Sequence, residues 1–150
     1  MQRTPRMVDI THKPDVIRVA VAEGFIKLRR ETVERIRRGE VEKGDPLSIA
    51  ALAAVMAVKN TPHIVMLAHN IPITSVKPEF DVREDGVLAR VEVVTTAKTG
   101  VEMEALTAVA AALLNIWDVV KKYEKDEAGQ YPNTKIEFIR VVRKVKGRGA

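Results

Sequence analysis

The sequence predicts an α+β protein in which an antiparallel sheet carries two long helices on one face. Three observations support this fold class. Segments with strand-like and helix-like patterns alternate along the chain, and Gly, Pro, Asn or Asp residues separate them. The two longest helical segments are apolar on nearly every side, which is typical of buried helices. The 150 residues contain no repeat and no break in composition, so we expect one domain over residues 1–150.

The first half of the chain predicts one strand and two helices. Residues 16–28 are rich in β-branched residues and alternate loosely, which predicts a long strand with a bulge at Gly24. Residues 29–38 place charges around two apolar positions and predict a short, exposed helix that ends at Gly39. Residues 45–59 begin with Asp-Pro, a pair that caps free amides and suits the first turn, so they predict a second, buried helix.

The second half predicts a hairpin, the longest helix and a last strand. After a short apolar stretch at 64–67, residues 73–82 and 87–96 predict two strands joined by a Glu-Asp-Gly turn. Residues 101–125 predict the longest helix, and residues 135–145 alternate as a final strand. This order is the ferredoxin-like split βαβ arrangement. Because the helices are so apolar and the uncovered sheet face retains Val and Ile, we expect an oligomer.

The composition excludes several kinds of site. Without cysteine the chain has no disulfide, thiolate metal site, cysteine nucleophile or iron–sulfur cluster. The histidines show neither HxxxH nor HExxH spacing, so we expect no metal site. The net charge of +5 favours an anionic partner, either nucleic acid or a phosphorylated small molecule. The charged N-terminal residues and the short apolar runs lead us to expect a cytoplasmic protein with no membrane partner.

Acidic and basic side chains interrupt the apolar pattern of the longest predicted helix. Glu104 and Asp118 are fourteen residues apart, a spacing that returns them to nearly the same face. Lys121 lies three residues beyond Asp118, within reach of its carboxylate, and such a pair can transfer protons or hold a phosphate. The alternative from spacing alone is an ordinary surface ion pair. However, an unpaired charge in an apolar helix costs folding free energy, which favours a functional role for these residues.

Other cations and a histidine are candidates for binding an anion. Lys43 precedes the helix that begins at residue 45, whose N-terminal amides favour anions; the alternative is a capped turn with a solvated lysine. His69 follows an apolar stretch at a loop, which suits a donor that faces a ligand. Arg18 in a strand and Lys59 at a helix end each fit a side chain that extends to water. The basic C-terminal run could close over phosphate or be a solvated tail.

Five segments together resemble one enzyme family over almost the whole chain. They are MVDITHK at 7–13, KGD at 43–45, LAHN at 67–70, TGVEMEALTAV at 99–109 and IWDVVK at 116–121. The sequence is similar to the cyclic pyranopterin monophosphate synthases, protein C of molybdenum cofactor biosynthesis. It differs from the family pattern where Ala and Asn replace the usual Cys and Pro in LAHN, and in the C-terminal tail.

The resemblance implies a ferredoxin-like subunit, a homohexamer built as a trimer of dimers, and active sites at the dimer interface. It implies conversion of (8S)-3',8-cyclo-7,8-dihydroguanosine 5'-triphosphate to cyclic pyranopterin monophosphate with release of pyrophosphate. No cofactor is implied, although magnesium can accompany the triphosphate. The catalytic positions are Asp118, Lys121 and Lys43. The implied substrate-binding positions are Leu67, Ala68, His69, Met103, Glu104, Glu102, Arg18, Lys13, Lys59, Lys144 and Arg148.

Two other hypotheses of function are alternatives to an enzyme. A basic, ferredoxin-like RNA-binding module without catalysis would carry aromatic residues on its central strands for base stacking. The chain has two Tyr, three Phe and one Trp, and no RNP1-like string, so we expect no nucleic acid partner. A purely structural oligomer would explain the apolar helices but would leave Glu104, Asp118 and Lys121 without a purpose.

Overall fold

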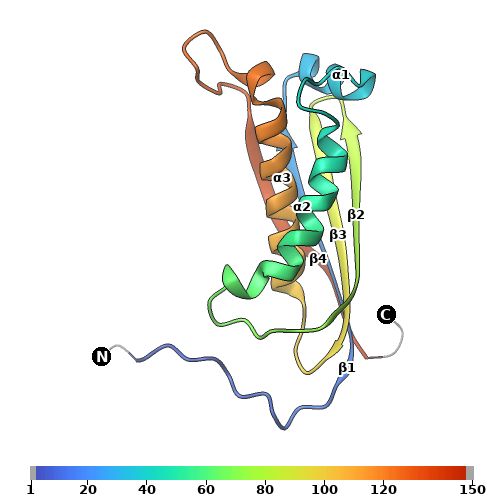
Figure 1. The fold of residues 1–150 in the computed structure, drawn as a ribbon, viewed down its shortest axis with the longest axis vertical. Helices are drawn as coiled ribbons and strands as arrows, with labels where there is room; N and C mark the ends of the chain where they lie inside the picture. The colour runs from blue at the N-terminus through green and yellow to red at the C-terminus, as the bar shows by residue number, and fades with distance from the viewer. Residues whose placement is uncertain (1–2, 148–150) are drawn as a thin grey trace.

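The computed structural model describes residues 3–147 and contains the predicted strands and long helices in the predicted order (Figure 1). In chain order the elements are β1 (Val16–Lys27), α1 (Arg30–Arg38), α2 (Pro46–Asn60), the 3-10 turn η1 (Thr61–His63), β2 (Ile73–Arg83), β3 (Gly86–Ala97), α3 (Glu102–Glu124) and β4 (Lys135–Lys146). The α+β class and the ferredoxin-like arrangement are therefore confirmed. The turn η1 is an addition, and the apolar stretch that follows it is exposed at Ile64 and Met66.

The sheet is antiparallel throughout, with the strand order β2-β3-β1-β4. The long helices α2 and α3 lie side by side on one face of it, and α1 lies across one end (Figure 1). The start of α2 is the predicted one: the carboxylate of Asp45 accepts a hydrogen bond from the amide of Leu47 at 3.1 Å, and Pro46 occupies the first helical position.

The core lies between α3 and the two central strands, and small residues allow a close approach. The helix-facing apolar residues of these strands that are fully buried are Ala20, Ala22, Ile26, Val87, Ala89, Val91 and Val93. At Gly24 an added Cβ would lie 2.7 Å from Cγ1 of Val109 and 2.8 Å from Cδ1 of Leu113. The glycine is therefore required because α3 packs directly on the strand.

The predicted bulge at Gly24 is wrong. Gly24 pairs in regular register with Ala89 of β3 and Ile139 of β4. The irregularities lie instead in the β1–β4 ladder after Val21 and after Phe25, where β4 carries the additional residues. In the sequence, a glycine within a strand indicates either a bulge or the close approach of another element. Gly24 is an example of the second case, because α3 packs closely against it.

Large apolar side chains remain exposed on both long helices. Leu52 and Met56 on α2 are 70% and 55% exposed, and Leu114 on α3 is 58% exposed. By length and composition alone α3 could cross a membrane, but it packs on α2 and on the sheet, as a core helix does. The sheet face opposite the helices carries charged pairs, among them Arg90 and Glu23 at 2.9 Å.

Candidate active site

Three of the predicted residues meet near the C-terminal end of α3. The Oδ2 atom of Asp118 lies 3.1 Å from Nζ of Lys43, and its Oδ1 atom lies 3.0 Å from Nζ of Lys121. The ammonium of Lys43 also donates to the backbone carbonyl of Asp118 at 3.4 Å. Lys121 is one helical turn beyond Asp118, whereas Lys43 reaches it from the loop between α1 and α2. One carboxylate thus lies between two ammonium groups.

The two lysines and the carboxylate of Asp118 stabilise one another's charged forms. Hydrogen bonds from Lys121 and Lys43, and their positive charges, lower the pKa of Asp118 below its ordinary value. The same contact with Asp118 raises the pKa of Lys121. In the free protein at neutral pH the carboxylate is ionised and the ammonium is protonated. The group therefore holds a proton acceptor and two proton donors in contact, and it carries a net positive charge.

An apolar wall stands beside these charges. Leu114, Trp117 and Ile136 line an open hollow of about 360 Å³ together with Asp118 and Lys121. The ring of Trp117 contacts the ring of Tyr131 edge-to-face, with centroids 5.2 Å apart. A flat heterocycle could pack against this wall while its polar edge faces the charges. The sequence analysis did not predict this wall. The signal for it was that the predicted helix over residues 101–125 is apolar on nearly every side, so not all of its apolar residues can face the core.

A second group of predicted residues lies at the N-terminal end of α3. Glu104 is only 3% exposed, and burial raises the pKa of its carboxyl. It lines a hollow of about 440 Å³ between α2 and β2, together with Lys59. Nearby, Glu102 pairs with Lys144 of β4 at 3.3 Å, and Met103 is exposed.

The remaining predicted residues lie near this second group. Arg18 does not extend to water as predicted: it is 6% exposed, its Nη2 atom donates to the carbonyl of Lys98 at 3.1 Å, and its buried Nε atom has no partner among the described residues. The Nζ atom of Lys98 donates to the carbonyl of Lys13 at 2.8 Å. The Nε2 atom of His69 lies 2.7 Å from the carbonyl of Val8.

Leu67 and Ala68 precede His69 in an irregular segment after η1, where the side chain of Leu67 is half exposed. Arg148 lies outside the described residues. Among residues 3–147, no group of three His, Asp or Glu side chains is arranged to hold a metal ion.

The two groups are not one site within a single chain. Glu104 and Asp118 are fourteen residues apart on one continuous helix, which separates them by about 21 Å at 1.5 Å per residue. Glu104 is buried in the cleft toward β2, whereas the side chain of Asp118 is 57% exposed and points to the loop of Lys43. A molecule that contacted both groups of the same chain would have to span about 21 Å along the helix.

Comparison with known proteins gives a consistent result over almost all of the chain. The model of the MoaC family matches residues 7–147. A protein of Aeropyrum pernix is 62% identical over 94% of this chain and 97% of its own length. Relatives from Archaeoglobus fulgidus and Pyrococcus furiosus are 58% and 55% identical, over 95% and 94% of this chain and 91% and 90% of their own lengths. All three are named "Probable cyclic pyranopterin monophosphate synthase".

Proposed function

The chain belongs to the MoaC family, and on that premise we propose that it is a cyclic pyranopterin monophosphate synthase. The reaction converts (8S)-3',8-cyclo-7,8-dihydroguanosine 5'-triphosphate to cyclic pyranopterin monophosphate and releases pyrophosphate, an early step of molybdenum cofactor biosynthesis. The observation that carries the proposal is the carboxylate of Asp118 held between the ammonium groups of Lys43 and Lys121.

This arrangement suits both halves of the chemistry. Opening the five-membered ring of the base and closing a new six-membered ring requires protons to be delivered and removed at several nitrogens. The lysines start as proton donors and Asp118 as the acceptor, and a lysine that has lost its proton becomes a base for the next step. Formation of the cyclic phosphate displaces pyrophosphate, whose negative charge the same ammonium groups stabilise.

The proposal includes no resident cofactor; magnesium enters, if at all, with the triphosphate. It includes a cytoplasmic location, where nucleoside triphosphates are formed.

A complete site in this proposal takes its two parts from two copies of the chain. Within each copy, about 21 Å along α3 separates the Lys43–Asp118–Lys121 group from the Glu104 group. In the proposed site, the Lys43–Asp118–Lys121 group of one copy therefore faces the Glu104 group of another. The exposed apolar residues Leu52 and Leu114 support association. We propose the homohexamer, a trimer of dimers, as the form in which these sites assemble.

A direct assay tests the function. The purified protein is incubated with the cyclised GTP intermediate, and pyrophosphate and the oxidised pterin product are measured over time. We expect both to form in equal amounts. Absence of both, from protein that remains folded and associated by light scattering, would reject the proposed function.

Mixed assemblies test whether a site is shared. Asp118→Asn and Glu104→Gln chains are each expected to form inactive assemblies. When they are unfolded and reassembled together, about a quarter of the sites should combine two intact parts in a random mixture, and activity should return to that extent. The Asp118→Asn chain mixed with a second Asp118→Asn preparation is the control. No recovery from well-mixed assemblies would contradict the shared site.

A further inference from the structure

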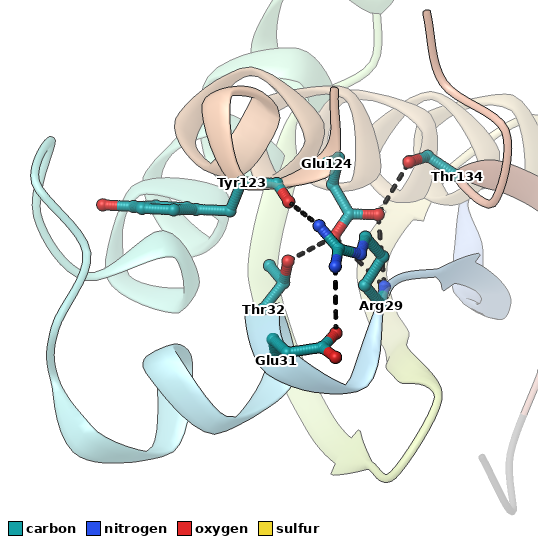
Figure 2. Close-up of polar contacts among 6 residues, drawn as sticks. All are labelled: Arg29, Glu31, Thr32, Tyr123, Glu124 and Thr134. Atoms are coloured by element: carbon teal, nitrogen blue, oxygen red, sulfur yellow. Dashed lines mark hydrogen bonds and ion pairs between the residues drawn. The ribbon is translucent and has the colours of Figure 1, made fainter. Parts of the chain in front are cut away.

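The end of α3 is joined to the start of α1 by a buried carboxylate. Glu124, the last residue of α3, is 1% exposed. Figure 2 shows its carboxyl group among Arg29, Thr32 and Thr134. Its two oxygens accept hydrogen bonds from the backbone amide of Arg29 at 3.2 and 3.1 Å, and from the hydroxyls of Thr32 and Thr134. Arg29 precedes the first turn of α1 and has no side-chain cap of its own. Glu124 therefore does for α1 what the glutamate of a capping box does, but from another helix.

Tyr123 extends this junction to the loop that follows α1. Its carbonyl accepts a hydrogen bond from Nη1 of Arg29 at 3.0 Å (Figure 2), and the guanidinium of Arg35 lies 4.4 Å from the centre of its ring. Its hydroxyl accepts a hydrogen bond from the backbone amide of Glu42 at 3.0 Å. Glu42 also pairs with Lys122, but both side chains are well exposed, and such pairs contribute little.

The residue after Glu42 is Lys43. The loop that delivers Lys43 to Asp118 is thus attached to the same helix that carries Asp118, one to two turns farther along it. We propose that Tyr123 is a positioning residue for the reaction: its hydroxyl holds the backbone at Glu42, on the support that Glu124 fixes, so that the ammonium of Lys43 reaches the carboxylate of Asp118.

For its kinetic consequence this inference rests on the proposed function. Tyr123→Phe removes one hydroxyl and keeps the ring beneath Arg35, so the fold should persist. We expect kcat to fall about 2- to 10-fold, the loss that corresponds to one hydrogen bond. In a Lys43→Ala background the same change should cost nothing further, because the hydroxyl acts only through Lys43. Glu127→Gln, an exposed change in the loop after α3, is the matched control and should leave kcat unchanged. An equal loss from Tyr123→Phe in both backgrounds would overturn the proposal.

Zero-length cross-linking tests the geometry without any turnover. A carbodiimide activates the carboxylate of Asp118, and the amines of Lys43 and Lys121 compete for it at 3.1 and 3.0 Å. Peptide mass spectrometry gives the ratio of the two cross-links. Because Lys121 is on the same helix as Asp118, its cross-link is an internal standard.

We expect Tyr123→Phe to lower the Lys43-to-Lys121 ratio at least twofold and Glu127→Gln to leave it unchanged. An unchanged ratio in Tyr123→Phe would overturn the positioning role. If the wild-type protein showed no turnover of the cyclised GTP intermediate, the proposed function would fail, and the cross-link ratio would still decide the inference.

Discussion

Replacing Glu104 by Gln is expected to stabilise the fold and to slow the reaction at the same time. Glu104 is 3% exposed, and burial, together with the nearby charge of Glu102, raises the pKa of its carboxyl. At neutral pH its charged form therefore costs the folded state free energy. The amide of Gln has nearly the same size and no charge, so it removes that cost.

The magnitude follows from the burial. Gln keeps the polar head of Glu and loses only its charge, and relieving one unfavourable feature commonly contributes about 0.5–2 kcal/mol, so we expect Glu104→Gln to raise the free energy of unfolding by about 1–2 kcal/mol at pH 7. In a chain of this size each kcal/mol shifts Tm by about 2–4 °C, which predicts a rise in Tm of about 2–8 °C. Activity should fall despite this gain. Glu104 and Lys59, two of the proposed substrate-binding residues, line the same hollow, and Gln does not supply a carboxylate there.

The pH dependence of Tm is an independent test of the sign of this stability difference. Because the pKa of Glu104 is raised on folding, its contribution to stability falls as pH rises from the ordinary value of 4.5 through the folded pKa. Gln does not titrate, so the two proteins should have equal Tm in acid below that value and differ most at neutral pH.

Thermal unfolding followed by circular dichroism between about pH 4 and pH 8, at one protein concentration, measures this difference. Exposed Glu127→Gln is the control. A lower Tm for Glu104→Gln at pH 7, or a difference independent of pH, would refute the reasoning.

Further predictions concern the proposed catalytic group of Lys43, Asp118 and Lys121, the packing of α3 and the choice of ligand. Asp118→Asn and Lys121→Ala should each lower turnover about 10²-fold or more. Because the two side chains act as one unit, the loss in the double variant should be much smaller than the product of the two single losses. Steady-state pyrophosphate release measures these losses, and Lys125→Ala is the control. Gly24→Ala should lower the free energy of unfolding by about 1–3 kcal/mol in denaturant titrations, because its Cβ would meet Val109 at 2.7 Å. An RNA oligonucleotide should bind weakly and only at low salt, in contrast to GTP-like ligands in calorimetry; salt-resistant binding would support the RNA-binding reading.

Local patterns were sufficient to predict the strands and the α-helices of the fold, but not the turn η1. Asp-Pro at the start of α2 and Gly at the end of α1 determine helix ends through a few neighbouring atoms, and the structure shows both: Gly39 has φ 68°, the left-handed conformation of a helix C-cap. Gly24 shows where local patterns stop being sufficient. Whether a strand glycine bends the chain or admits a helix depends on Val109, which is distant in the sequence.

The candidate site was predictable to the same extent. The spacing of Asp118 and Lys121 follows from one helix, and the structure places them in contact. The contact of Lys43 with Asp118 depends on how α1 and its loop pack, which spacing does not contain. The role of Glu124 was missed, although a carboxylate in the last turn of a helix opposes the helix dipole and indicates a partner elsewhere.

The length of α3 has a consequence for the activity of assemblies that mix normal and defective chains. Because its two ends belong to different sites in the proposed assembly, every chain takes part in two sites, and every site depends on two chains. A chain defective at both ends, mixed at random with normal chains, would disable each site it enters from either side. Activity would then fall as the square of the normal fraction rather than in proportion to it, so an equal mixture of normal and defective chains would retain about a quarter of the activity instead of about half.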